Sequence, residues 1–241
     1  MTEPLLELAA SVLDRVVDEI VFVGGATIGL WQSEPAAPPA RMTDDVDAIC
    51  EAATRSGYQH LASRLRARGF REASDSPVIC RWRHPESGLI LDLMPDDERV
   101  FGFTNSWYSM AFETALVRRL PSGARIRAAA PPALLATKLE AWKGRGRGDV
   151  LRSLDVHDVV VLVDGRPELG PELSSASAEL RAFVGRELLA LRADPYFDYV
   201  IDSALQRYGR VADDRADLVR ARIDALGDDG GAGGDALVRE R

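Results

Sequence analysis

The chain has 241 residues, of which 46% are hydrophobic and 28% are charged, a balance typical of a globular domain with a sizeable core. Its formal net charge of -8 excludes a protein coated with positive charge for indiscriminate nucleic-acid binding. No stretch approaches the roughly 20 apolar residues of a membrane-spanning helix, which excludes an integral membrane protein. The N-terminus has no secretory signal pattern and the only cysteines are Cys50 and Cys80, so we expect a cytoplasmic protein without disulfides or a membrane partner.

Hydrophobic periodicity predicts a mixture of helices and strands in the first half of the chain. The predicted elements are, in chain order, a helix over 3–19, a strand over 20–23, a short helix over 26–31, a proline-rich loop over 33–42, a strand over 43–49, a helix over 55–68, a hairpin of strands over 78–82 and 89–94, and a second hairpin over 115–126.

From residue 131 onward the pattern is helical. The predicted helices cover 132–143, 153–164, 170–193, 198–208 and 213–225. We therefore expect an α+β (α/β) fold, in which a mixed β-sheet flanked by helices is followed by a helical C-terminal region. The expected divisions are a core over 1–129, a helical subdomain over 130–226, and a flexible, glycine-rich tail over 227–241.

Three aspartates in apolar surroundings are the first feature with chemical content. Asp45 and Asp47 stand two residues apart in a predicted strand, so their side chains project to the same face. Asp92 stands alone among apolar residues, where a carboxylate is costly unless it is paired, hydrogen-bonded or bound to metal. Carboxylates on neighbouring strands would form a hard oxygen site suited to Mg²⁺. The alternative for the Asp45/Asp47 pair is a solvated edge strand or a capping aspartate.

A glycine pair follows the first predicted strand. Gly24 and Gly25 lie between that strand and a short predicted helix. Glycines at such a turn let backbone N–H groups approach a phosphate closely, and the start of a helix favours negative charge. The alternative is a simple turn. The glycine pair indicates a phosphate site only in combination with the three acids.

These motifs together resemble a known superfamily. The segments Val23–Gly25, Thr43–Asp47 and Ile90–Leu93 are similar to the core of polymerase-β-type nucleotidyltransferases, and within them to the AbiEii-like (DUF1814-like) bacterial family, which includes toxins of toxin–antitoxin pairs. The resemblance covers roughly residues 20–165. Its later segments are 134–141, 144–149 and 153–159.

The resemblance implies specific roles within a nucleotidyltransferase core over 1–129. The three acids Asp45, Asp47 and Asp92 would be catalytic and would bind Mg²⁺ (or Mn²⁺), and the Gly24–Gly25 turn would hold the phosphates of a nucleoside triphosphate. Lys138 would neutralise the triphosphate. Many superfamily members have serine after the first glycine; this chain has Gly25 and then Ala26, so Thr27 would have to supply the hydroxyl.

A basic segment follows the core. Between residues 138 and 152 the chain has an excess of three positive charges, which suits the neutralisation of a triphosphate. Arg145 and Arg147 alternate with glycines and could close over a nucleotide, although a solvated loop is the alternative. Asp155 and Asp158 lie one helical turn apart, and we expect them to support the site through salt bridges with the arginines rather than to act directly.

Residues 55–71 contain five arginines and no acid, which suits either an RNA backbone or a charged helix face. The expected function is Mg²⁺-dependent transfer of a nucleoside monophosphate from an NTP to a hydroxyl. The resemblance implies a tRNA 3′ end or a protein as acceptor, and a toxin role controlled by a cognate antitoxin. The alternatives are transfer to a small molecule such as an antibiotic, and a non-catalytic module that binds or senses nucleotide.

Overall fold

The computed structural model describes residues 3–52, 54–144, 149–205 and 213–231. The chain divides into two compact units. Unit one comprises Met1–Leu30 and Ala40–Ala130, and unit two comprises Trp31–Pro39 and Pro131–Arg241. The segment 31–39, which the sequence placed in the core over 1–129, therefore groups with the helical second unit.

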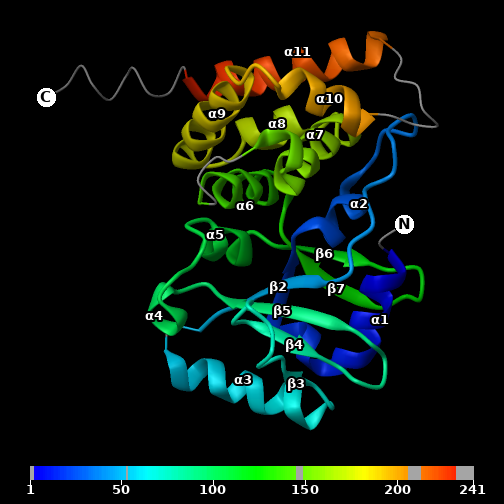
Figure 1. The fold of residues 1–241 in the computed structure, drawn as a ribbon, viewed down its shortest axis with the longest axis vertical. Coiled ribbons are helices and arrows are strands. Elements are labelled where there is room, and N and C mark those ends of the chain that lie inside the picture. Colours follow the sequence, from blue (N-terminus) through cyan, green and yellow to red (C-terminus); the bar gives the residue numbers. More distant parts are fainter. Residues whose placement is uncertain (1–2, 53, 145–148, 206–212, 232–241) are drawn as a thin grey trace, which may run out of the picture. The chain divides into compact units, whose positions relative to one another are not determined.

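Unit one is built around a mixed β-sheet (Figure 1). Its strands are β1 (Ile20–Val23), β2 (Val46–Cys50), β3 (Arg71–Glu72), β4 (Arg81–Arg83), β5 (Ile90–Pro95), β6 (Leu116–Arg119) and β7 (Arg125–Ala128). Within the described residues, the strand order is β3-β4-β5-β2-β1-β7-β6. The pairs β2–β5 and β1–β7 are parallel, whereas β1–β2 and the outer pairs are antiparallel. The expected fold class, a mixed sheet flanked by helices and followed by a helical region, is confirmed.

The centre of the sheet is buried because its strands are apolar on both faces. All four residues of β1 are at most 2% exposed, and most of β2 and β5 is buried as well. Such continuous Val, Ile and Leu runs are typical of strands covered on both sides.

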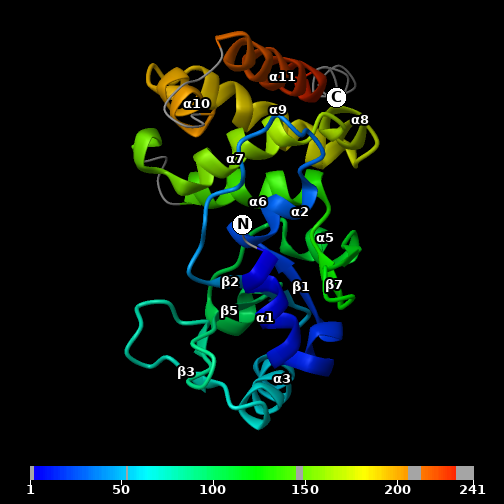
Figure 2. The same ribbon diagram turned by 90° about the vertical axis from the view of Figure 1, so that its right-hand side faces the viewer.

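The helices of this unit that pack around the sheet are α1 (Glu3–Leu13), α3 (Arg55–Ala67), α4 (Glu98–Phe101) and α5 (Tyr108–Glu113). The short helix α2 (Ile28–Trp31) follows the turn after β1. Helix α1 packs against β2 and lies in front of the sheet in Figure 2. Helix α3 is tied to the sheet by Tyr58, whose hydroxyl donates to the Leu93 carbonyl (3.2 Å) and accepts from the Trp82 indole N–H (3.1 Å).

Two strand boundaries differ from the predicted ones. Strand β2 begins at Val46 rather than at residue 43, because the Thr43 hydroxyl donates to the Asp45 carbonyl (3.1 Å) and the chain bends there. Strand β4 begins at Arg81 rather than at residue 78, because its N–H closes a turn onto the Val78 carbonyl (3.2 Å). Asp45 therefore lies one residue before the strand that carries Asp47.

Unit two is helical. Its helices are α6 (Pro131–Gly144), α7 (Leu154–Gly165), α8 (Leu169–Ser174), α9 (Ala178–Arg192), α10 (Phe197–Leu205) and α11 (Asp213–Gly231). Helices α9 and α11 lie side by side (Figure 1), and α6 packs against α7. None of the helices in the described residues has the length and apolar character that a membrane crossing needs.

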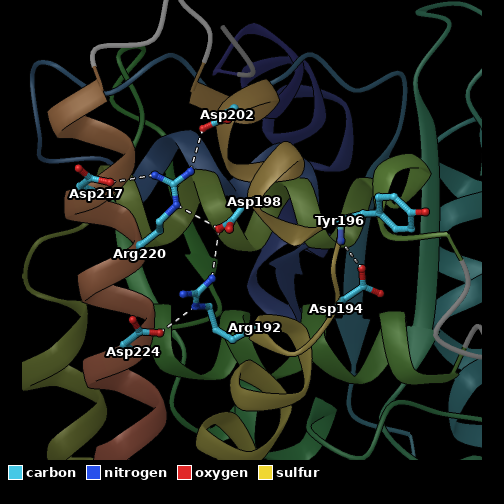
Figure 3. Close-up of polar contacts among 8 residues, drawn as sticks. All are labelled: Arg192, Asp194, Tyr196, Asp198, Asp202, Asp217, Arg220 and Asp224. Atoms are coloured by element: carbon cyan, nitrogen blue, oxygen red, sulfur yellow. Dashed lines mark hydrogen bonds and ion pairs between the residues drawn. The ribbon is translucent and has the colours of Figure 1, made fainter.

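Charged side chains link α9, α10 and α11 on the surface of unit two (Figure 3). Arg192 on α9 donates to Asp198 on α10 (3.1 Å) and to Asp224 on α11 (2.8 Å). Arg220 on α11 donates to the same Asp198 (3.0 Å) and to Asp202 (3.1 Å). Each exposed pair contributes at most about 1 kcal/mol. Because the two arginines share one aspartate, the network connects all three helices.

Two helical predictions need correction. The single helix expected over 170–193 is interrupted, and Ser177 caps the second part by accepting from the Leu180 N–H (3.2 Å). The tail expected from residue 227 begins as helix, because α11 continues to Gly231. Gly227 packs so close to Leu189 of α9 that a Cβ there would lie 3.2 Å from a Leu189 methyl group. The rest of the expected tail, 232–241, lies outside the described residues.

Cys50 and Cys80 form no disulfide with each other and are buried in unit one, with exposures of 1% and 3%. Burial raises the pKa of each thiol to about 12, and negative charge at Asp96 (for Cys50) or at Asp92 and Asp47 (for Cys80) adds to the effect.

We therefore predict that neither thiol reacts with a disulfide reagent in the native protein at pH 8, because the thiolate is the reactive form and is scarce there. Both should react once the chain is unfolded in guanidinium chloride. A stopped-flow or absorbance assay of thiol release measures this. A thiol that reacts rapidly in the native state at pH 8 would contradict the burial that we describe.

Candidate functional site

The register of β2 and β5 brings two of the predicted carboxylates together. Asp47 on β2 is the Cα partner of Asp92 on the neighbouring parallel strand. Side chains at paired positions leave the sheet on the same face, so the two carboxylates share one side of unit one. Asp92 is 6% exposed, and Asp47 is half-buried. The sequence pattern alone predicted this convergence of acids on adjacent strands.

The backbone of Gly24 packs closely against the Asp47 side chain. Val23, the last residue of β1, pairs with Asp47, so the next residue passes directly beside that side chain. Gly24 has φ +74° and ψ -167°, a conformation essentially restricted to glycine. A Cβ at this position would lie 1.9 Å from the Asp47 Oδ2 atom. The Asp47 carboxylate thus occupies the space that any other side chain at position 24 would need.

The rest of the turn is closed by Thr27. Its hydroxyl donates to the Gly24 carbonyl (2.9 Å), and its N–H donates to the same oxygen (3.2 Å). Thr27 is fully buried, and Gly25 is buried beside it. The hydroxyl that the sequence offered for phosphate contact therefore serves to hold the turn. Gly24 and Gly25 do lie at the predicted strand-to-helix turn.

Arg81 forms hydrogen bonds with the other two carboxylates, Asp92 and Asp45. It lies on β4 opposite Asp92 in the antiparallel register. Its Nε donates to Asp92 Oδ1 (2.8 Å), and its Nη2 donates both to Asp92 Oδ2 (2.7 Å) and to Asp45 Oδ2 (2.6 Å). These hydrogen bonds to Asp92, and the nearby charge of Asp45 and Asp47, raise the pKa of Arg81 above its ordinary value. The guanidinium is therefore always charged.

The donor set has the chemistry of a divalent-cation site but is arranged around an arginine. Three carboxylates stand against one guanidinium, so these four groups carry a formal charge of -2, which a single divalent ion would balance. Carboxylate oxygens are the ligands that Mg²⁺ prefers. Among the residues that the structure describes, however, no group of three or more His, Cys, Asp or Glu side chains is placed to hold a metal ion. The residue types fit the ion, whereas their present arrangement is that of a bridged ion pair.

Lys138 lies on α6 of unit two, where it contacts the two acids of α7. Its Nζ lies 2.7 Å from Asp158 Oδ2 and 3.3 Å from Asp155 Oδ1. All three side chains are at most 8% exposed. Asp155 and Asp158 thus both form salt bridges with Lys138. The expected pairs with Arg145 and Arg147 involve residues outside the described part of the chain. A surface lysine, the ordinary alternative for Lys138, is excluded by this burial.

The remaining basic candidates divide into two groups. Arg145 and Arg147 fall in 145–148, outside the described residues. Three arginines of the 55–71 segment pair with carboxylates of unit one, as expected for a charged helix face. These pairs are Arg64–Glu19, Arg66–Glu72 and Arg68–Asp14.

Sequence reasoning missed two features of the site. Arg81 lies in the run 78–82, which we interpreted only as one strand of a hairpin, although an arginine within an apolar run signals a buried partner. The close packing of Gly24 on Asp47 was also missed, because the pattern predicts the turn but not what lies against it. Only the strand register reveals both contacts.

Comparison with known proteins gives little independent support. No family model matches the sequence, and no curated protein matches it either. One similar solved structure is a crystal structure of a protein from H. pylori that is provisionally named a nucleotidyltransferase. The TM-score is 0.47 at 12% identity, over 99% of this chain and 96% of that one. A TM-score in this range does not establish a shared fold or function.

The contact between Gly24 and Asp47 generates a stability prediction. We expect Gly24→Ala to destabilise the protein by more than about 2 kcal/mol, because the methyl group strains the backbone and displaces a half-buried carboxylate. Gly88→Ala is the matched control: Gly88 has nearly the same φ of +75°, but nothing lies within 4 Å of a Cβ there. The free energy of unfolding in urea measures both. Equal losses in the two variants would show that the contact with Asp47 is not tight.

The buried ion cluster of Lys138, Asp155 and Asp158 generates a second stability prediction. Lys138→Met removes the ammonium from between two buried carboxylates, and we expect a loss of about 3–5 kcal/mol in the free energy of unfolding. Lys143→Met, on the same helix, removes an exposed lysine that pairs only with Glu140 among the ion pairs of the described residues, and should cost under about 1 kcal/mol. Adding Asp155→Asn and Asp158→Asn to Lys138→Met should recover part of the loss. A Lys138 variant as stable as the Lys143 variant would contradict this account.

Proposed function

We propose that unit one is the catalytic core of a Mg²⁺-dependent nucleotidyltransferase. The observation that carries the proposal is that Asp45, Asp47 and Asp92 converge beside the Gly24 turn. Any side chain at position 24 would collide with Asp47. A purely structural site gains nothing from three carboxylates around one arginine, since their repulsion and burial cost stability. In a site that receives a cation, the ion would offset that repulsion.

In this proposal the three carboxylates would hold the metal ion. When bound, Mg²⁺ would balance the charge on the triphosphate and favour ionisation of the acceptor hydroxyl. Asp92 would stand nearest to that hydroxyl and help to take its proton. Backbone N–H groups at Gly24 and Gly25 would contact the phosphates, and the oxygen of the acceptor would displace pyrophosphate in line.

Lys138, Arg145 and Arg147 are proposed phosphate ligands, with different support. Lys138 is already bound to Asp155 and Asp158, so those acids would orient it and offset part of its charge. The two arginines are proposed from the sequence alone. Together with the resemblance to AbiEii-like enzymes, these residues support an NTP as the donor substrate.

The acceptor in this proposal is a tRNA 3′ end or a protein hydroxyl, and the physiological role is that of a toxin held in check by a cognate antitoxin. Both rest on the family resemblance. The competing possibility is a non-catalytic nucleotide-binding module. One observation favours the non-catalytic module: Arg81 already binds two of the three acids, as expected of a site that no longer binds a metal ion. Transfer to a small molecule such as an antibiotic is a third possibility within the same chemistry.

A transfer assay tests the proposal. NTPs labelled at the α-phosphate are incubated one at a time with Mg²⁺, total tRNA and the purified protein, beside Asp47→Asn. We expect labelled product with the wild type and a loss on the order of 10²–10³-fold with Asp47→Asn, the effect of removing one electrostatic stabiliser. Asp44→Asn is the matched control, because Asp44 is an exposed neighbour of Asp45 and lies outside the cluster.

The position of the label distinguishes the acceptors. Label on tRNA supports the tRNA 3′ end, and label on the protein itself supports a protein hydroxyl. Nucleotide binding without transfer would leave the small-molecule acceptor and the binding module. If the protein shows no transfer and no Mg²⁺-dependent nucleotide binding, the proposal is overturned.

A further inference from the structure

Arg81 holds the carboxylates with three short contacts from one guanidinium. Two of them form a side-on fork with Asp92, and the third reaches Asp45. Charge-assisted contacts of 2.6–2.8 Å are among the strongest hydrogen bonds in proteins. The guanidinium therefore provides the positive charge that keeps Asp45 and Asp92 close together.

Strand β4 has other anchors besides this side chain. Strand β4 is held by its backbone ladder to β5 and by Trp82, which is 1% exposed. Arg83, two residues further along the same strand, pairs instead with Asp75, which is well exposed. The two arginines of β4 thus differ in their partners, and only Arg81 binds the acids of the candidate site.

Arg81 and a divalent cation would compete for the same groups. Each carboxylate has about four acceptor positions, so a metal ion could find a lone pair beside the guanidinium. A dication and a guanidinium on one carboxylate repel each other, however, and both oxygens of Asp92 are already engaged. The Arg81 side chain is 21% exposed, so it has a path towards water when it leaves.

We propose that Arg81 is a built-in counter-ion that occupies the carboxylate site in the absence of metal and is displaced when a divalent cation binds. This inference rests on the proposed function, since it takes the three acids as the cation ligands. Arg81 is then a positioning residue: it keeps the acids assembled, and it sets a threshold of metal concentration below which the site stays closed.

Metal affinity in the absence of nucleotide tests the inference. The full chain, stripped with EDTA, is titrated with Mn²⁺ and free Mn²⁺ is followed by electron paramagnetic resonance. We expect Arg81→Ala to bind Mn²⁺ roughly 10- to 100-fold more tightly than the wild type, the scale of one charge-assisted contact. Its metal-free melting temperature should fall, and Mn²⁺ should raise that temperature by more than in the wild type. Arg83→Ala should leave Mn²⁺ affinity unchanged.

A measurement on the wild type guards against a variant that fails to fold. The Nε–H signal of Arg81, assigned by its loss in Arg81→Lys, should move towards the position of a free arginine as Mg²⁺ is added. A signal that stays in place while Mg²⁺ binds would overturn the inference. Mn²⁺ affinity that is equal or weaker in Arg81→Ala would do the same, because a fixed structural arginine would produce that result.

The two proposals fail in different ways. If the wild type binds Mn²⁺ and transfers nucleotide but Arg81→Ala binds no tighter, only the counter-ion role is wrong. If neither the wild type nor Arg81→Ala binds Mn²⁺ at all, the carboxylates do not form a metal site. The proposed function then falls together with the inference.

Discussion

The mutual repulsion of three carboxylates is the constraint on which the candidate site depends. Asp47 and Asp92 are held near one another by a strand register that backbone hydrogen bonds fix, and Asp45 lies one residue before the same strand. Two devices accommodate the repulsion. Gly24 leaves room for one carboxylate by having no side chain, and Arg81 binds the other two. The folding free energy of the sheet therefore offsets the repulsion among the carboxylates.

The sequence predicts the acids and the turn because each has a local signature. Asp45 and Asp47 are two residues apart, Asp92 stands in an apolar run, and Gly24 ends a buried strand. These signals follow from the period of a strand and the cost of a buried charge. Arg81 has no comparable local signal, because its partners lie 11 and 36 positions away and depend on how a hairpin aligns. Register is a property of the folded sheet and not of either strand alone.

The helical unit shows the same limit. The periodicity of α6 and α7 predicts both helices, yet it does not say that Lys138 faces Asp155 and Asp158. A residue surrounded by apolar neighbours such as Leu134 and Leu135 is expected to extend its charge to water. It stays buried here because two carboxylates on the next helix replace that water. The break after α8 was missed for a related reason, since a serine cap interrupts a periodicity that would otherwise continue.

This pairing changes how the basic segment is understood. The excess of three positive charges between residues 138 and 152 falls to one when Asp155 and Asp158 are included, since they bind Lys138 directly. A triphosphate carries more negative charge than that excess can balance, so in the proposed function most of the compensation would come from the cation and from other side chains. In the proposed displacement, binding of a dication would release the Arg81 guanidinium, which would then be available to a phosphate. The same residue would then oppose the metal before binding and favour the nucleotide afterwards, which couples the two binding events through a single side chain.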